Sequence, residues 1–178
     1  FMLAFTILFY VVVYTIWLKR RTSQNIVIGG AAGALPPVIG WTIATGTITL
    51  EPILLFLIIF FWTPSHFWAL SLFKSEDYKK ANIPMLPIIS GIKITKINIF
   101  VYSVILFGVS LTPFLFSYFS IFYFLASLIL GGYYMYLCFQ LLVENDKVRE
   151  TQLEKNIFFF SILYLFLIFI IILLDKSI

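Results

Sequence analysis

The residues best suited to chemistry lie in the short connections between long apolar segments. The first group is Lys19, Arg20 and Arg21, followed by Asn25 and a glycine-rich stretch. Basic side chains next to the free amides of a helix N-terminus supply both positive charge and hydrogen-bond donors, so this arrangement suits an anion such as a diphosphate. Lys and Arg also flank membrane spans for purely topological reasons, and this alternative stays open.

A second group follows in the stretch KSEDYKKANIPMLPIISGIKITK. Its only carboxylates are Glu76 and Asp77, and they lie among lysines that include Lys80. Hard oxygen ligands of this kind suit Mg²⁺ bound together with phosphate groups. The alternative is a solvated loop with ion pairs of little consequence.

The only histidine, His66, lies two residues after Pro64 within an apolar run. A histidine inside a membrane is costly unless it faces a cavity or a partner, which makes it a candidate functional residue. It could equally satisfy carbonyls that the proline leaves open. The neighbouring Trp62, Phe67 and Trp68 fit a lipid-facing or core position, or the wall of a pocket that stabilises a cation.

The composition places these groups in an integral membrane protein with a single membrane domain, residues 1–178. Of the 178 residues 62% are hydrophobic and only 11% are charged, far below the roughly 25% charged share of soluble domains. Cys138 is alone, which excludes a disulfide framework and a cysteine-based metal site. The net charge of +4 comes from short clusters rather than a long basic face, so we expect no nucleic-acid partner.

About six segments are long and apolar enough to cross a bilayer, which predicts an all-α, polytopic helical bundle. The second segment carries several glycines and Pro36-Pro37, and we expect it to form a kinked helix in the interior of the bundle. The segments lie near residues 1–18, 26–47, 53–73, 97–117, 119–143 and 156–174.

The basic residues fall in alternate connections. The first, third and fifth carry Lys and Arg, and the second and fourth carry none. By the positive-inside rule the odd connections face the cytoplasm and both ends of the chain lie outside. Because the sequence begins with Phe1 inside an apolar segment, we expect an N-terminal part to be missing from it.

Three stretches are similar to the signature segments of the protohaem IX farnesyltransferase family, a branch of the intramembrane aromatic prenyltransferases. They are LKRRTSQNIVIGGAAGALPPVIGW at 18–41, WTPSHFWALSL at 62–72 and DYKKANIPMLPIISG at 77–91. The similarity keeps the order and spacing of the family along nearly the whole chain. It implies a bundle of roughly nine spans, of which this chain resembles the fourth to the ninth, around a cavity that opens to the cytoplasm.

The resemblance also implies an activity and its partners. Family enzymes join farnesyl diphosphate to the vinyl group of haem b, with Mg²⁺ assisting the departure of diphosphate, and give haem O for terminal oxidases. Haem b is a substrate here, not a permanent cofactor. The expected setting is a bacterial inner membrane, with the active site facing the cytoplasm, membrane lipids around it and a haem A synthase as a possible partner.

The resemblance assigns roles to particular residues. Lys19 and Arg20, with Tyr14 about one turn earlier, match the segment near the diphosphate. Asp77 matches an acidic metal-binding position, with Glu76 as a second carboxylate. His66 matches the intramembrane histidine, for which we expect contact with haem or its iron. Asn25 is expected to order the first connection. The full candidate set is Asp77, Lys19 and Arg20 as catalytic, Tyr14, Arg21, Asn25, His66 and Lys80 as substrate-binding, and Asp77 with Glu76 as metal-binding.

The chain departs from the family pattern at four points. The first Asp-rich motif of the superfamily is absent, so this chain is expected to hold an incomplete metal site. Ala81 stands where the wider superfamily places a second aspartate, Ser65 replaces a proline and Asn82 replaces a glycine. Two other classes remain as alternatives: a small-solute transporter with broken helices, and a non-catalytic assembly subunit or decayed fragment.

Overall fold

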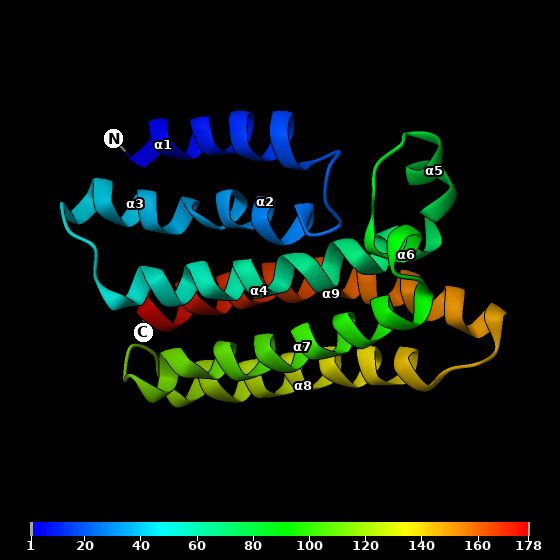
Figure 1. Ribbon diagram of the computed structural model, residues 1–178. Coiled ribbons are helices and arrows are strands. Elements are labelled where there is room, and N and C mark those ends of the chain that lie inside the picture. The colour runs from blue at the N-terminus through cyan, green and yellow to red at the C-terminus, as the bar shows by residue number, and fades with distance from the viewer. Residues whose placement is uncertain (1, 178) are drawn as a thin grey trace.

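Long helices make up the protein, as the apolar segments predict. A computed structural model describes residues 2–177, and every regular element in that range is helical (Figure 1). The elements are α1 (Met2–Leu8), η1 (Phe9–Leu18), α2 (Asn25–Ala34), α3 (Pro36–Thr45), α4 (Leu50–Phe73), α5 (Ser75–Lys80), α6 (Leu86–Ile89), α7 (Ile92–Leu115), α8 (Ile121–Val143) and α9 (Lys147–Ser177).

Five of the six predicted spans are long and apolar enough to cross a membrane: α2 with α3, then α4, α7, α8 and α9. The remaining segment, Met2–Leu18, is also an apolar helix but is shorter, and its last ten residues form the π-helix η1. The protein is therefore a polytopic membrane bundle. Helices α7 and α9 begin at Ile92 and Lys147, earlier than predicted, because their hydrogen bonding continues into charged turns that a hydropathy pattern excludes.

The second span is kinked as predicted. Helix α2 ends at Ala34 and α3 begins at Pro36, since a proline lacks the amide donor that a continuous helix needs but fits a first helical turn. The prediction that this span lies in the interior holds for α2, which packs between η1 and α4, but is wrong for α3 in the described chain. In α3 only Val38 is buried, and Ile43 is 79% exposed, because α3 packs chiefly on α4.

The core lies among α4, α7, α8 and α9, which run side by side, while α2 and α3 cover another side of α4 and η1 lies outermost (Figure 1). Large side chains such as Trp68, Tyr134 and Tyr164 fill this core. Small serines let the helices approach and donate their hydroxyl protons to carbonyls of their own helix three residues earlier. They are Ser65, Ser71, Ser103, Ser110 and Ser161.

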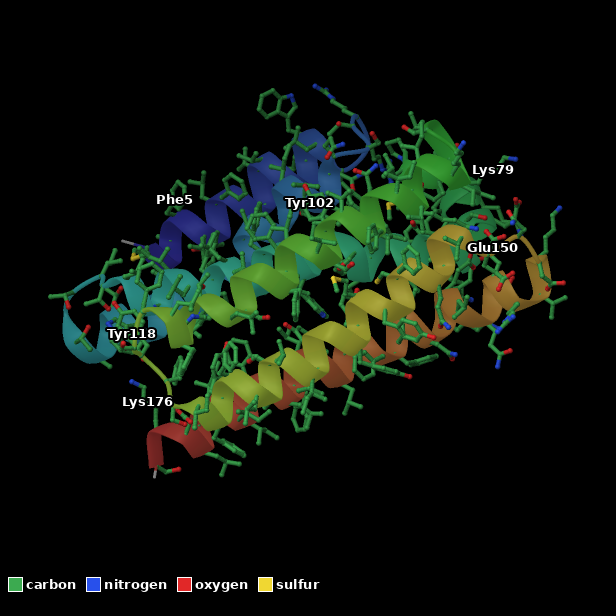
Figure 2. The ribbon with its side chains drawn as sticks, turned by 90° about the horizontal axis from the view of Figure 1, so that it is seen from below. Phe5, Lys79, Tyr102, Tyr118, Glu150 and Lys176 are labelled. Carbon is green, nitrogen blue, oxygen red and sulfur yellow. The ribbon has the colours of Figure 1, made fainter. Side chains whose placement is uncertain are left out.

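The charged connections gather at one end of the bundle. The loop after η1, the segment with α5 and α6, and the turn between α8 and α9 lie there, whereas both termini lie at the opposite end (Figure 1). Figure 2 likewise places Lys79 and Glu150 near one end and Lys176 near the other. The fold thus brings the predicted odd connections together, so that their residues can build one site.

Both ends of α9 are tied to other helices by ion pairs. Near its start, Glu150 contacts Lys96 at 3.1 Å, and Lys96 also donates to the carbonyl of Glu144 at 3.0 Å. Near its end, Lys176 contacts Glu51 at 3.0 Å. The sequence predicted Lys96 in a loop, but the structure places it in α7 with only 8% exposed.

Replacing Lys96 by methionine is expected to lower the free energy of unfolding by about 3 kcal/mol, because it leaves the half-enclosed Glu150 carboxylate without its partner. Denaturant titration in detergent micelles measures the change. The matched control is Lys93→Met, one turn earlier and exposed, with an expected change within about 0.5 kcal/mol. Equal effects of the two substitutions would show that the ion pair does not stabilise this turn.

Candidate functional site

A pocket of about 230 Å³ lies between η1, α2 and α4 near the charged end. Helix η1 contributes Tyr10 and Tyr14, and α4 contributes Trp62, Thr63 and Phe67. The glycine-rich face of α2 forms the third wall. The pocket is lined by apolar and aromatic side chains. Such a lining suits a hydrocarbon chain and can shield a developing carbocation from water.

Two glycines of α2 allow this close arrangement. A Cβ atom on Gly29 would lie 2.4 Å from the ring of Tyr14, and one on Gly30 would lie 3.0 Å from the methyl group of Thr63. Gly33, one turn further, has no neighbouring atom within 4 Å of such a Cβ. The glycine-rich sequence therefore sets the positions of Tyr14 and Thr63 in the pocket wall.

Alanine at Gly29 is expected to displace the Tyr14 ring and to lower the free energy of unfolding by about 1–3 kcal/mol through overpacking. Alanine at Gly33 is expected to raise the free energy of unfolding by about 0.5–1 kcal/mol, since Ala favours a helix more than Gly. Thermal unfolding of the two variants in the same detergent gives the comparison. A Gly29→Ala protein as stable as Gly33→Ala would contradict the close packing.

The first connection follows η1, whose Tyr14 lines this pocket. The backbone amide of Lys19 donates to the carbonyl of Tyr14 at 2.8 Å, five residues earlier, as in a π-helical turn. Asn25 is 1% exposed, and its Nδ2 donates to the carbonyls of Lys19 at 3.1 Å and Thr22 at 2.8 Å. Lys19 is half-buried, whereas Arg20 and Arg21 are exposed. Asn25 thus orders the connection that presents these cations.

The two acidic residues of the second connection face different pockets. Asp77 lines a pocket with Lys74 and Tyr78, and its carboxylate contacts Lys74 at 3.3 Å. Glu76 lines another pocket with Lys79. Lys80 is exposed at the end of α5. The structure therefore does not bring Glu76 and Asp77 together, because consecutive residues of a helix point in different directions.

The described residues do not fit a complete Mg²⁺ site. Asp77 has the right ligand chemistry and is accessible, but it is the only carboxylate lining its pocket. Across residues 2–177 no group of three or more His, Cys, Asp or Glu side chains comes together.

Tyr78 lies near Tyr14 of η1 and was not among the predicted site residues. It lies on α5, half-buried, and burial raises the pKa of its phenol, which therefore keeps its proton at neutral pH. Its hydroxyl group is close enough to that of Tyr14 for the two to interact electrostatically. A phenol in this position can donate a hydrogen bond to an oxyanion between the connections. Only tertiary structure reveals the proximity.

His66 is held tightly in the membrane part of α4. It is 7% exposed, its ring is stacked between Trp62 and Phe158 at centroid distances of 4.3 and 4.7 Å, and its Nδ1 lies 2.6 Å from the Oγ of Ser161. The single hydroxyl proton of Ser161 goes to the carbonyl of Phe158 at 2.6 Å. His66 Nδ1 therefore donates, and Nε2 keeps its lone pair.

Two departures from the family pattern have a structural explanation. Ser65 accepts a hydrogen bond from Tyr134 at 3.0 Å, so its hydroxyl joins α4 to α8 inside the core. Asn82 has a backbone φ of 53°, in the left-handed region where Gly and Asn are favoured. Both residues therefore fit their positions without disturbing the helices that carry the site.

Comparisons with known proteins agree with this geometry. Residues 1–172 match the UbiA prenyltransferase family. The chain is 61% identical over 98% of its length to Protoheme IX farnesyltransferase of Pelagibacter ubique (strain HTCC1062), covering 58% of that protein. It is 52% identical over 98% of its length to the protein of the same name from Rhodopseudomonas palustris (strain HaA2), covering 56% of it. No solved structure matches the chain.

Proposed function

Because this chain belongs to the UbiA prenyltransferase family, we propose that it serves the transfer of a farnesyl group from farnesyl diphosphate to the vinyl group of haem b, giving haem O. The observation that carries the proposal is the 61% identity, over 98% of this chain, to a protein named Protoheme IX farnesyltransferase. The chain spans a little over half the length of the curated relatives it matches. The activity and substrates of a whole enzyme are therefore proposed here.

In the proposed reaction the bond between C1 of the farnesyl group and the diphosphate oxygen breaks, and its electron pair leaves with diphosphate. The π electrons of the vinyl group form the new carbon–carbon bond, and water supplies the hydroxyl group of haem O while releasing a proton. The aromatic pocket formed by Tyr10, Tyr14, Trp62 and Phe67 would hold the farnesyl chain and shield the cation.

Basic residues of the first connection would stabilise the leaving diphosphate. Lys19 and Arg20 supply positive charge in the connection that follows the pocket-lining helix η1, and Arg21 adds a further cation at the surface. Lys80 would attract the diphosphate from the second connection. Asp77 can contribute one oxygen ligand to a divalent cation, and Mg²⁺ is our proposal for that ion. Since the described residues do not complete such a site, we assign no reaction step to it.

His66 would contact the haem substrate. Ser161 holds its ring in the tautomer in which Nε2 has a free lone pair, the form needed to bind iron or to accept a proton. Its neighbours Trp62 and Phe67 line the pocket proposed for the farnesyl chain. A porphyrin held by His66 would therefore lie beside the isoprenoid, as prenyl transfer requires.

The proposed setting is the inner membrane of a bacterium, with the charged end facing the cytoplasm. Five membrane-length helices place the protein in a bilayer, and the basic connections at one end favour this orientation. Farnesyl diphosphate, haem b and membrane lipids are the proposed partners. A haem A synthase is a further candidate because it would consume haem O.

The test is formation of haem O by the purified protein in lipid vesicles supplied with haem b, farnesyl diphosphate and Mg²⁺, detected by mass spectrometry. We expect a product whose mass exceeds that of haem b by one farnesyl group and one hydroxyl group. A folded protein that binds neither substrate would instead support the non-catalytic subunit. Activity that survives alanine at both Asp77 and Lys19 would contradict the assigned site.

A further inference from the structure

A second cleft opens at the charged end, on the other side of α5 from Asp77. Its volume is about 250 Å³, and its polar members are Ser75, Glu76, Lys79 and Glu154. Its apolar members come from the end of α4, from α6 and from the start of α7. The cleft is thus half polar and half apolar, and it lies where helices leave the apolar part of the bundle.

Glu154 gives the cleft a carboxyl group without a direct partner. It lies in the second turn of α9 and is only 6% exposed, yet within residues 2–177 its carboxylate has neither a hydrogen bond nor an ion pair. Lys96 and the exposed Lys155 are near enough to act on it electrostatically, but neither forms an ion pair with it. The ammonium of Lys96, however, is already bound to Glu150 at 3.1 Å and to the Glu144 carbonyl at 3.0 Å. A buried carboxylate without a partner is costly, so a positively charged ligand would stabilise it.

We propose that this cleft binds the headgroup of a zwitterionic phospholipid with a primary ammonium, such as phosphatidylethanolamine. The ammonium would donate to Glu154 inside the cleft, with Glu76 adding negative charge, and the lipid phosphate would contact the exposed Lys79. Figure 2 shows Lys79 at the same end of the bundle as Glu150, which is one turn from Glu154.

The surroundings of the cleft favour a lipid over a metal ion or a soluble amine. Ile89 and Ile92, beside the cleft at the end of α6 and the start of α7, are 61% and 55% exposed and offer an apolar surface for acyl chains. A metal ion would require more carboxylates than the cleft contains, since no group of three or more ligating side chains occurs in residues 2–177.

Native mass spectrometry of the purified protein tests the proposal, with phosphatidylethanolamine, phosphatidylcholine and phosphatidylglycerol of identical acyl chains. We expect phosphatidylethanolamine to bind at least about tenfold more tightly than the other two, because the trimethylated and the ammonium-free headgroups cannot donate N–H bonds to Glu154. Glu154→Gln should remove this preference. Asp146→Asn, which removes one exposed charge at the same end and can still cap α9, should keep it.

A second pair of variants keeps the test valid if Glu154→Gln does not fold, as judged by its melting temperature. Lys79→Met should weaken phosphatidylethanolamine binding about threefold, and Lys93→Met, outside the cleft, should leave it unchanged. Equal binding of the three lipids, or an unchanged preference in Glu154→Gln, would overturn the proposal. So would soluble glycerophosphoethanolamine that binds as tightly as the lipid, because the site would then recognise a free amine.

Discussion

Alanine at both Lys19 and Arg20 is expected to reduce the rate of farnesyl transfer about a thousandfold. Both residues belong to the connection that begins at the pocket, and Asn25 holds the backbone of Lys19 in place. Removing one group that stabilises a developing oxyanion typically lowers kcat by about 10²–10³, and two groups that act on one leaving group do not contribute additively. The measurement is kcat with saturating farnesyl diphosphate.

The control for this prediction makes the same change in net charge at two other residues. Lys147 and Lys155 are exposed at the same end and line a separate surface pocket on α9. Alanine at both should change kcat less than about twofold, since exposed charges at a distance are largely screened by salt. Equal losses in the two double variants would mean that Lys19 and Arg20 only set the orientation of the protein in the membrane.

Glutamine at His66 is expected to lower both haem affinity and transfer rate about a hundredfold. A glutamine amide can still donate to Ser161, but it has no imidazole nitrogen to bind iron. Ser161→Ala keeps the imidazole but removes the hydroxyl group that fixes its tautomer. This variant should lower haem affinity and transfer rate about tenfold, in the range found for groups that orient a metal ligand. Titration with haem b, followed by its Soret absorption, separates this effect from loss of folding.

The melting temperature provides the control for His66. His66 is stacked between Trp62 and Phe158, so its replacement removes some packing, and a modest decrease is expected for any substitution there. The haem spectrum should change only if the imidazole contacts iron. A His66→Gln protein with the wild-type haem spectrum and rate would assign His66 to packing alone.

The sequence predicted the helices well because apolar runs of membrane length leave few other structures possible. It also predicted the break at Pro36 and the gathering of the basic connections at one end. It could not predict that α7 and α9 continue through charged turns, nor that Lys96 is buried in α7. Hydropathy describes how a residue interacts with solvent, whereas the ion pair with Glu150 depends on a helix 54 residues later.

The residue types of the candidate site stay a prediction, and their geometry could not be predicted from the sequence. That Asp77 and Glu76 line different pockets depends on how α5 is rotated, and a six-residue helix has too little periodicity to show this. The partner of His66 is Ser161, 95 residues away, and Tyr78 approaches Tyr14 only in the fold. Contacts of this kind cannot be predicted from the local spacing of residues in the sequence.

The ion pairs at both ends of α9 have a consequence for the shape of a second apolar cleft. An apolar cleft lies between α3 and α9, and Phe166 and Phe169 line it on the α9 side. Because the ion pairs of Glu150 and Lys176 hold that helix at each end, its aromatic face forms a wall of the cleft with a fixed position. The facing Pro36 and Pro37 begin α3, which contains no charged residue and forms no ion pair. Substitutions that widen or narrow this cleft should therefore be tolerated more readily in α3 than in α9.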